Sequence, residues 1–171
     1  MQTETMTKPM VIGPADGKLV TLQTIGVRYM IPGEHTENRL SLVEHPLPPL
    51  ALAAPLHRHS REDEYSFVLE GRMGALLGDE VVYTEPGDLV YKPRGQWHTF
   101  WNAIDAPTRI LEIISPSGFE LFFEELADIV VDGVPDEARF GPLRERYGLD
   151  MQLDSVPALI ERFGLRFPGA E

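Results

Sequence analysis

Two histidines stand one residue apart in the segment PLHRHSREDEYSFVLEG, which covers residues 55–71. Side chains two positions apart in a β-strand lie on the same face, so His57 and His59 can bind one ion together. Glu64 begins the next run of β-forming residues, and His98 begins a later one. Imidazoles combined with a carboxylate suit first-row divalent ions, whereas Mg²⁺ and Ca²⁺ prefer oxygen ligands. The spacing therefore predicts a site for one divalent transition metal (Fe, Mn, Co, Ni, Cu or Zn), without indicating which.

The place of Glu64 in this site depends on the register of its strand. If residues 60–63 form a turn, Glu64 lies opposite the two histidines, and a slip of one residue would put Asp63 there instead. Glu62 and Asp63 otherwise belong to a charged run, which we expect to be a solvent-exposed turn. His35 and His45 lie outside the pattern, and we expect a surface or structural position for both.

The elements that must position these residues are mostly strands. Between residues 18 and 115, short runs rich in β-branched and aromatic residues alternate with Gly, Pro, Asp or Asn, which predicts a sandwich or barrel. After Ser115 the spacing becomes helical, and Phe119, Phe122 and Leu126 form a stripe that we expect to pack against the barrel. We expect a single domain over residues 1–171, because no segment is typical of a linker.

The chain resembles the cupin superfamily in both sequence motifs of that family, which here read His57-x-His59-x4-Glu64-x6-Gly71 and Gly87-x5-Pro93-x-Gly95-x2-His98-x3-Asn102. The resemblance implies an all-β fold, a double-stranded β-helix (jelly-roll) barrel over about residues 40–115. Strands over about 18–40 precede it, and a short helical segment over about 117–165 follows. It also implies one metal bound through His57, His59, Glu64 and His98, and a homodimer.

Two further segments, GEHTENRLSL (33–42) and PSGFELFFEEL (116–126), are similar to bacterial single-domain, quercetin-dioxygenase-like cupins. That likeness implies a metal-dependent dioxygenase that cleaves a phenolic or flavonol-like substrate with O2, with Glu64 as metal ligand and general base. Two alternatives stay open: a binding or sensing protein without turnover, and a metal-dependent isomerase or epimerase.

Strand alternation predicts which residues line a substrate pocket beside the metal. Counting from Glu64 and His98, we expect Ser66, Val68, Phe100 and Asn102 to face inward, and we expect Met73 to line the pocket with them. A residue as small as Ser66 would leave room for a bulky ligand.

The composition limits the kinds of molecule that the protein can be expected to bind. The net charge is −12 with no basic stripe, which argues against nucleic acid and anionic membranes. No apolar run approaches the roughly 18 residues of a membrane span, and no signal-peptide pattern is visible, so we expect a cytoplasmic protein. The absence of cysteine excludes disulfides and thiolate ligands. The expected partners are a small molecule and O2.

Overall fold

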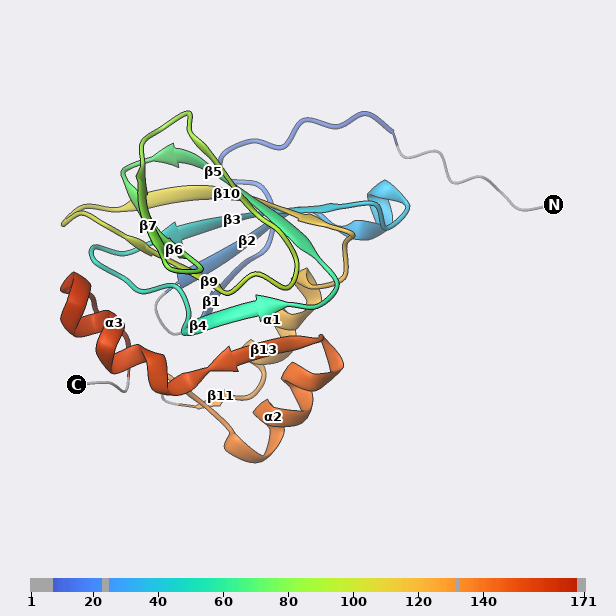
Figure 1. Ribbon diagram of the computed structural model, residues 1–171. Helices are drawn as coiled ribbons and strands as arrows, with labels where there is room; N and C mark the ends of the chain where they lie inside the picture. The colour runs from blue at the N-terminus through green and yellow to red at the C-terminus, as the bar shows by residue number, and fades with distance from the viewer. Residues whose placement is uncertain (1–7, 23–24, 132, 169–171) are drawn as a thin grey trace.

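Two antiparallel sheets face each other to form a barrel in the computed structural model, which describes residues 8–22, 25–131 and 133–168 (Figure 1). The six-stranded sheet has, in spatial order, β1 (Leu19–Leu22), β2 (Ile25–Ile31), β3 (Ser41–Leu47), β10 (Thr108–Ser115), β5 (Asp63–Glu70) and β8 (Leu89–Lys92). The five-stranded sheet has β13 (Leu149–Gln152), β4 (Leu56–His59), β9 (His98–Asn102), β6 (Met73–Leu77) and β7 (Glu80–Thr84). This arrangement confirms the predicted all-β jelly-roll barrel.

Alternating burial along the strands builds the core between the sheets. In β10, every second residue from Thr108 to Ile114 is buried, and the residues between them are partly exposed. Val27, Val43 and Val68 come from neighbouring strands of the same sheet and join this core with no exposed surface. The inner face is therefore set by a two-residue period, as the sequence pattern predicts.

A second, smaller core lies outside the five-stranded sheet, where Trp101 of β9 stacks on Phe163 with 4.3 Å between ring centroids. Gly74 of the neighbouring strand β6 makes room for the indole, since a Cβ at that position would lie 2.3 Å from the Trp101 ring. The close approach explains why this strand position has no side chain.

The C-terminal segment is helical, as predicted, but it also adds strands. Its helices are α1 (Glu120–Ala127), α2 (Glu137–Arg146) and α3 (Val156–Phe163), and a short 3-10 turn at Leu153–Ser155 precedes α3. Another 3-10 turn lies at Gly33–Thr36, between β2 and β3. A small hairpin joins β11 (Val130–Val131) to β12 (Val134–Pro135). The strand β13, which the sequence reading did not predict, pairs with β4 so that Leu149 lies opposite His59 and Met151 opposite His57.

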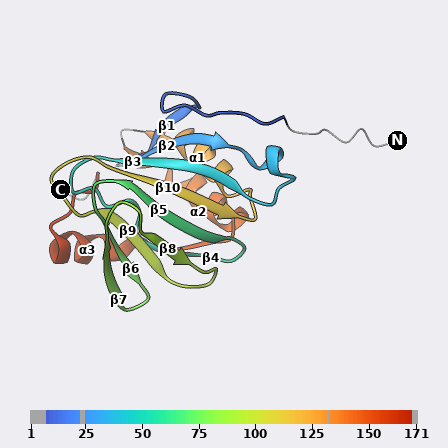
Figure 2. The same ribbon diagram turned by 90° about the horizontal axis from the view of Figure 1, so that it is seen from above.

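Figure 1 shows the C-terminal segment, orange to red, along the lower side of the barrel, and in Figure 2 much of it lies behind the strands. Pairing between β13 and β4 fixes it beside the strand that carries the two histidines. The segment can therefore form a wall of any cavity that opens next to them. Within the described residues, no helix is long and apolar enough to cross a membrane.

Candidate metal centre and cavity

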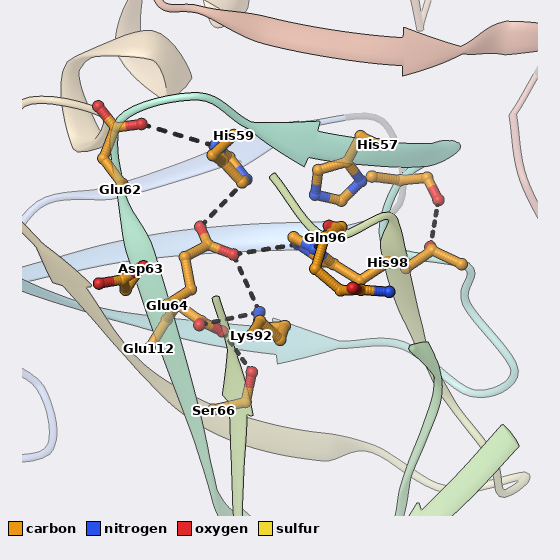
Figure 3. Close-up of polar contacts among 12 residues, drawn as sticks. His57, His59, Glu62, Asp63, Glu64, Ser66, Lys92, Gln96, His98 and Glu112 are labelled. Atoms are coloured by element: carbon orange, nitrogen blue, oxygen red, sulfur yellow. Dashed lines mark hydrogen bonds and ion pairs between the residues drawn. The ribbon is translucent and has the colours of Figure 1, made fainter. Parts of the chain in front are cut away.

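Both sheets contribute to a single cluster at the predicted metal site (Figure 3). His57 and His59 are the two buried, inward-facing positions of β4, and His98 of β9 lies opposite His57 in the strand pairing. Glu64 is the first buried position of β5, in the opposing sheet. One ligand atom from each of the four residues lies within 4.8 Å of the others. The structure thus brings together all four side chains of the predicted set.

The loop before β9 is attached to the end of β4. Gly95 donates its backbone N–H to the carbonyl of His59 at 2.7 Å and has a φ of +78°, which favours glycine. This attachment fixes where β9 begins, and therefore where His98 enters the cluster.

The outer nitrogens of two histidines are held by backbone carbonyls. Nδ1 of His57 lies 2.8 Å from the carbonyl of Pro55, and Nδ1 of His98 lies 3.0 Å from that of Gln96. A carbonyl oxygen can only accept, so each Nδ1 carries the proton and a neutral ring keeps a lone pair on Nε2. Such outer hydrogen bonds orient histidines that bind metals.

The inner atoms of the cluster face one another as acceptors. Nε2 of His98 lies 3.4 Å from one Glu64 oxygen, and Nε2 of His59 lies 3.5 Å from the other. Both nitrogens are buried and have no hydrogen-bond partner in the part of the chain that the structure describes. Buried acceptors that face a carboxylate leave a position that a cation would satisfy, so this donor set fits a divalent transition metal.

The electrostatics keep His57 and His59 neutral and Glu64 charged. Burial lowers the pKa of His57 well below its usual value and lowers that of His59 to about 4. Burial raises the pKa of Glu64, but the neighbouring imidazoles and the ammonium of Lys92 outweigh it, so that pKa lies well below its usual range. Neutral imidazoles and an ionised carboxylate are the states in which these groups bind metals.

A buried lysine, which the sequence reading missed, lies behind the cluster. Nζ of Lys92 on β8 is 3.0 Å from Glu64 and 2.9 Å from Glu112 of β10, and the Ser66 hydroxyl donates to Glu112 at 2.7 Å. Burial would lower the pKa of Lys92, but the two carboxylates raise it, so the amine stays charged. Burial raises the pKa of Glu112 to about 7, although Lys92 opposes the shift. Ser66 thus supports this network.

The charged run before Glu64 divides between two roles. Asp63 accepts hydrogen bonds from the backbone and side chain of Arg94 at 2.9–3.0 Å, so Glu64 and not Asp63 completes the cluster. The predicted exposed turn is wrong for Glu62, which is only 5% exposed. Its Oε2 lies 3.9 Å from Nδ1 of His59, and burial raises its pKa to about 7. The segment between β4 and β5 thus places Glu62 beside His59 and away from solvent.

A cavity of about 700 Å³ opens beside the cluster, and His57, His59 and Glu64 form part of its wall. Most of the remaining lining is apolar. Phe119 meets the ring of His59 edge to face at 4.3 Å and stacks on Phe122 at 4.9 Å. We expected the stripe that contains these two residues to be packing only, yet both line the cavity. Further walls come from the C-terminal segment, including Phe140, Leu149, Met151 and Phe167.

Of the five residues predicted to line a substrate pocket, only Phe100 lies in the cavity wall. All five are buried, as alternation predicts, but the other four lie elsewhere: Ser66, Val68, Met73 and Asn102. Val68 and Met73 belong to the packed core, and the Asn102 amide donates to three backbone carbonyls. Alternation gives the face of a strand, whereas the cavity occupies only part of the inner face.

These features define a cupin-type barrel with a candidate metal centre, and comparison with known proteins agrees. Residues 44–114 match the family described as "Cupin domain". This match and the barrel support membership of the cupin superfamily, as the two motifs predicted. A curated relative, "Oxidoreductase iacF" of Pestalotiopsis fici, is 44% identical over 48 residues. That match covers 28% of this chain and 24% of the relative, so the chain spans about a quarter of its length.

Solved structures share the barrel. KdgF from a Halomonas species has a TM-score of 0.59 at 16% identity, covering 67% of this chain and 99% of its own, which shows the fold alone. The polyketide cyclase RemF from Streptomyces resistomycificus has a TM-score of 0.55 at 26% identity, covering 64% and 81% of the two chains.

Proposed function

We propose that this protein is a metal-dependent enzyme acting on a flat, largely apolar aromatic molecule with an enolic or phenolic oxygen, with oxygenation as the first candidate reaction. One observation carries the proposal: a buried His/Glu cluster that fits a divalent ion forms part of the wall of an aromatic-lined cavity of about 700 Å³. Cavities of this size and lining hold drug-sized molecules. The name of the curated relative that matches over 48 residues, an oxidoreductase, agrees with this proposal.

His57, His59, His98 and Glu64 would hold the ion. A bound ion would supply a Lewis acid for a substrate oxygen and, if redox-active, a path for electrons to O2. Phe119 and Phe122 present stacked aromatic rings next to His59, where they would orient a planar substrate and exclude water.

Glu64 as general base stays a prediction. The carboxylate is ionised at neutral pH, as a base must be, but its pKa lies well below its usual range, which makes it a weak one. The network with Lys92 therefore favours a ligand role for Glu64 over proton abstraction.

A second candidate is a non-oxidative reaction on the same substrate class, such as isomerisation or ring closure. The likeness to a polyketide cyclase at 26% identity favours it. The same cluster would polarise a carbonyl without any need for O2.

Elemental analysis of untagged protein, expressed separately with Fe, Mn, Co, Ni, Cu or Zn, tests the proposal. We expect near-stoichiometric metal in the wild type and in the His35→Ala control, and loss of metal in His59→Ala and Glu64→Ala. Metal retained at full occupancy by either ligand variant would contradict the assignment. Oxygen uptake on addition of a flavonol supports the first candidate, and anaerobic product formation supports the second.

A further inference from the structure

His45 is a polar residue in the cavity wall that lies outside both sequence motifs. It occupies an inward position of β3, opposite Ile110 of β10, and is 2% exposed. We expected a surface or structural position, and the burial excludes the first. Its place in the wall raises the question of what its ring offers to the cavity.

The backbone determines the protonation of this ring. Nδ1 of His45 lies 3.1 Å from the carbonyl oxygen of Gly26, which can only accept, so Nδ1 carries a proton. Burial lowers the pKa of His45 to about 4, although the Gly26 carbonyl opposes the shift. The imidazole is therefore neutral at pH 7, and its Nε2 carries a lone pair. Among the described residues, Nε2 has no hydrogen-bond partner.

The neighbours of the ring fix its orientation without satisfying Nε2. Phe123 meets it edge to face at 5.5 Å, and Phe100 lies at 6.0 Å. Nε2 keeps some accessible surface, unlike the fully buried Nε2 atoms of His59 and His98, so a donor in the cavity can reach it. Because Nδ1 is held by β2, Nε2 is the polar atom that remains for the cavity.

The geometry points to Nε2 of His45 as the acceptor for a hydroxyl group of the cavity ligand, at a position separate from the His57, His59, Glu64 and His98 cluster. This inference deepens the proposed function and rests on it only in taking the cavity as the ligand site. The ligand would then be an uncharged, flat aromatic that carries a hydroxyl donor in addition to any oxygen that meets the metal.

Binding of 2-naphthol and naphthalene to full-length, chelator-treated protein tests this inference. The two probes differ by one hydroxyl, and removing metal prevents the hydroxyl from binding there instead. We expect His45→Leu to weaken 2-naphthol binding about fivefold, the effect of one neutral hydrogen bond, and to leave naphthalene nearly unchanged. His45→Gln, whose amide can donate to Gly26 and accept from the probe, should recover part of the loss. The control Leu126→Ala, another wall residue, should change both probes alike.

Equal losses for both probes in His45→Leu would assign the residue to packing and overturn the inference. Unchanged 2-naphthol binding in His45→Leu would mean that Nε2 bonds only to water, which would overturn the inference. A wild type that binds neither probe would show that the cavity is not a ligand site, which would overturn it as well. Failure of the metal proposal is separate, since a protein that never takes up metal would still show the 2-naphthol preference.

Discussion

The ammonium of Lys92 lies 3.0 Å from Oε2 of Glu64, on the carboxylate that the motifs assign to the metal. The other oxygen of Glu64 lies 3.5 Å from Nε2 of His59. The oxygen held by Lys92 also lies 3.4 Å from Nε2 of His98, while the other oxygen faces His59. A metal ion would share this carboxylate with lysine, and its affinity would be lower than that of the same ligands without Lys92.

Replacing Lys92 with methionine should destabilise the metal-free protein by about 3–5 kcal/mol, the usual effect of leaving buried charges without a partner. Lys92 is 1% exposed, and the variant leaves Glu64 and Glu112 without their shared cation. Urea denaturation at pH 8 in the presence of a chelator measures the loss. Added metal should restore part of it.

Lys18→Met is the matched control for this substitution. Lys18 pairs with Glu124 at the surface, where its side chain is 64% exposed, so its loss should cost less than about 1 kcal/mol. Equal stability of Lys92→Met and wild type would contradict the buried network.

Glu62→Gln should weaken metal binding about tenfold, the lower end of the effect of outer carboxylates on metal-binding histidines. Oε2 of Glu62 lies 3.9 Å from Nδ1 of His59, and neither atom has a hydrogen-bond partner among the described residues. Competition between the protein and a chelating dye for Zn²⁺ measures the affinity. Glu80→Gln, at an exposed position of β7, is the control and should bind as the wild type does. Unchanged affinity in Glu62→Gln would show that Glu62 does not support His59.

Acid should destabilise the wild type more than His45→Gln. The pKa of His45 is about 4 in the folded protein, against 6.5 in the unfolded chain, because burial disfavours the charged ring. The ammonium of Lys92 lowers this pKa further. The Gly26 carbonyl and the carboxylates of Glu64 and Glu44 raise it, but by less. As the pH falls below 6.5, the unfolded state takes up a proton that the folded state does not, so stability falls down to about pH 4.

This single group should cost the wild type about 2 kcal/mol at pH 5 relative to pH 7.5. Urea denaturation of both metal-free proteins at the two pH values measures the difference. Because the other histidines are common to both proteins, the comparison isolates His45. Parallel pH profiles would show that the folded ring is protonated as readily as in the unfolded chain.

The four residues of the cluster were predictable because their positions follow from short-range rules. His57 and His59 share a face by the two-residue period, and the turn after His59 determines where Glu64 begins its strand. Pro93 and Gly95 indicate the turn that precedes His98. Each step uses only a few neighbouring residues, which is the range over which sequence patterns are informative.

Lys92 and Glu112 could not be predicted in the same way, because a buried charge depends on partners that come from other strands. The three come from β8, β10 and β5, and strand pairing alone brings them together. A lysine after Leu-Val-Tyr is typical of an exposed strand end. For His45, alternation with Val43 and Leu47 was an available signal, but its tautomer depends on Gly26 in another strand.

Gly74→Ala should destabilise the protein by about 1–3 kcal/mol, the range for an overpacked core. The added Cβ would lie 2.3 Å from the indole of Trp101, which is 1% exposed and stacks on Phe163 of α3. Because the ring cannot move without disturbing α3, the loss of stability should be accompanied by faster proteolysis of the C-terminal segment, which forms part of the cavity wall.

Gly141→Ala in α2 is the matched control, since a Cβ there meets nothing within 4 Å apart from its chain neighbours. Alanine is the better helix former, but Pro142 follows and disfavours a Cβ at the preceding helical position, so that variant should differ from the wild type by less than about 1 kcal/mol. Urea denaturation of both variants makes the comparison, and a Gly74→Ala protein as stable as Gly141→Ala would show that α3 does not depend on the position of Trp101.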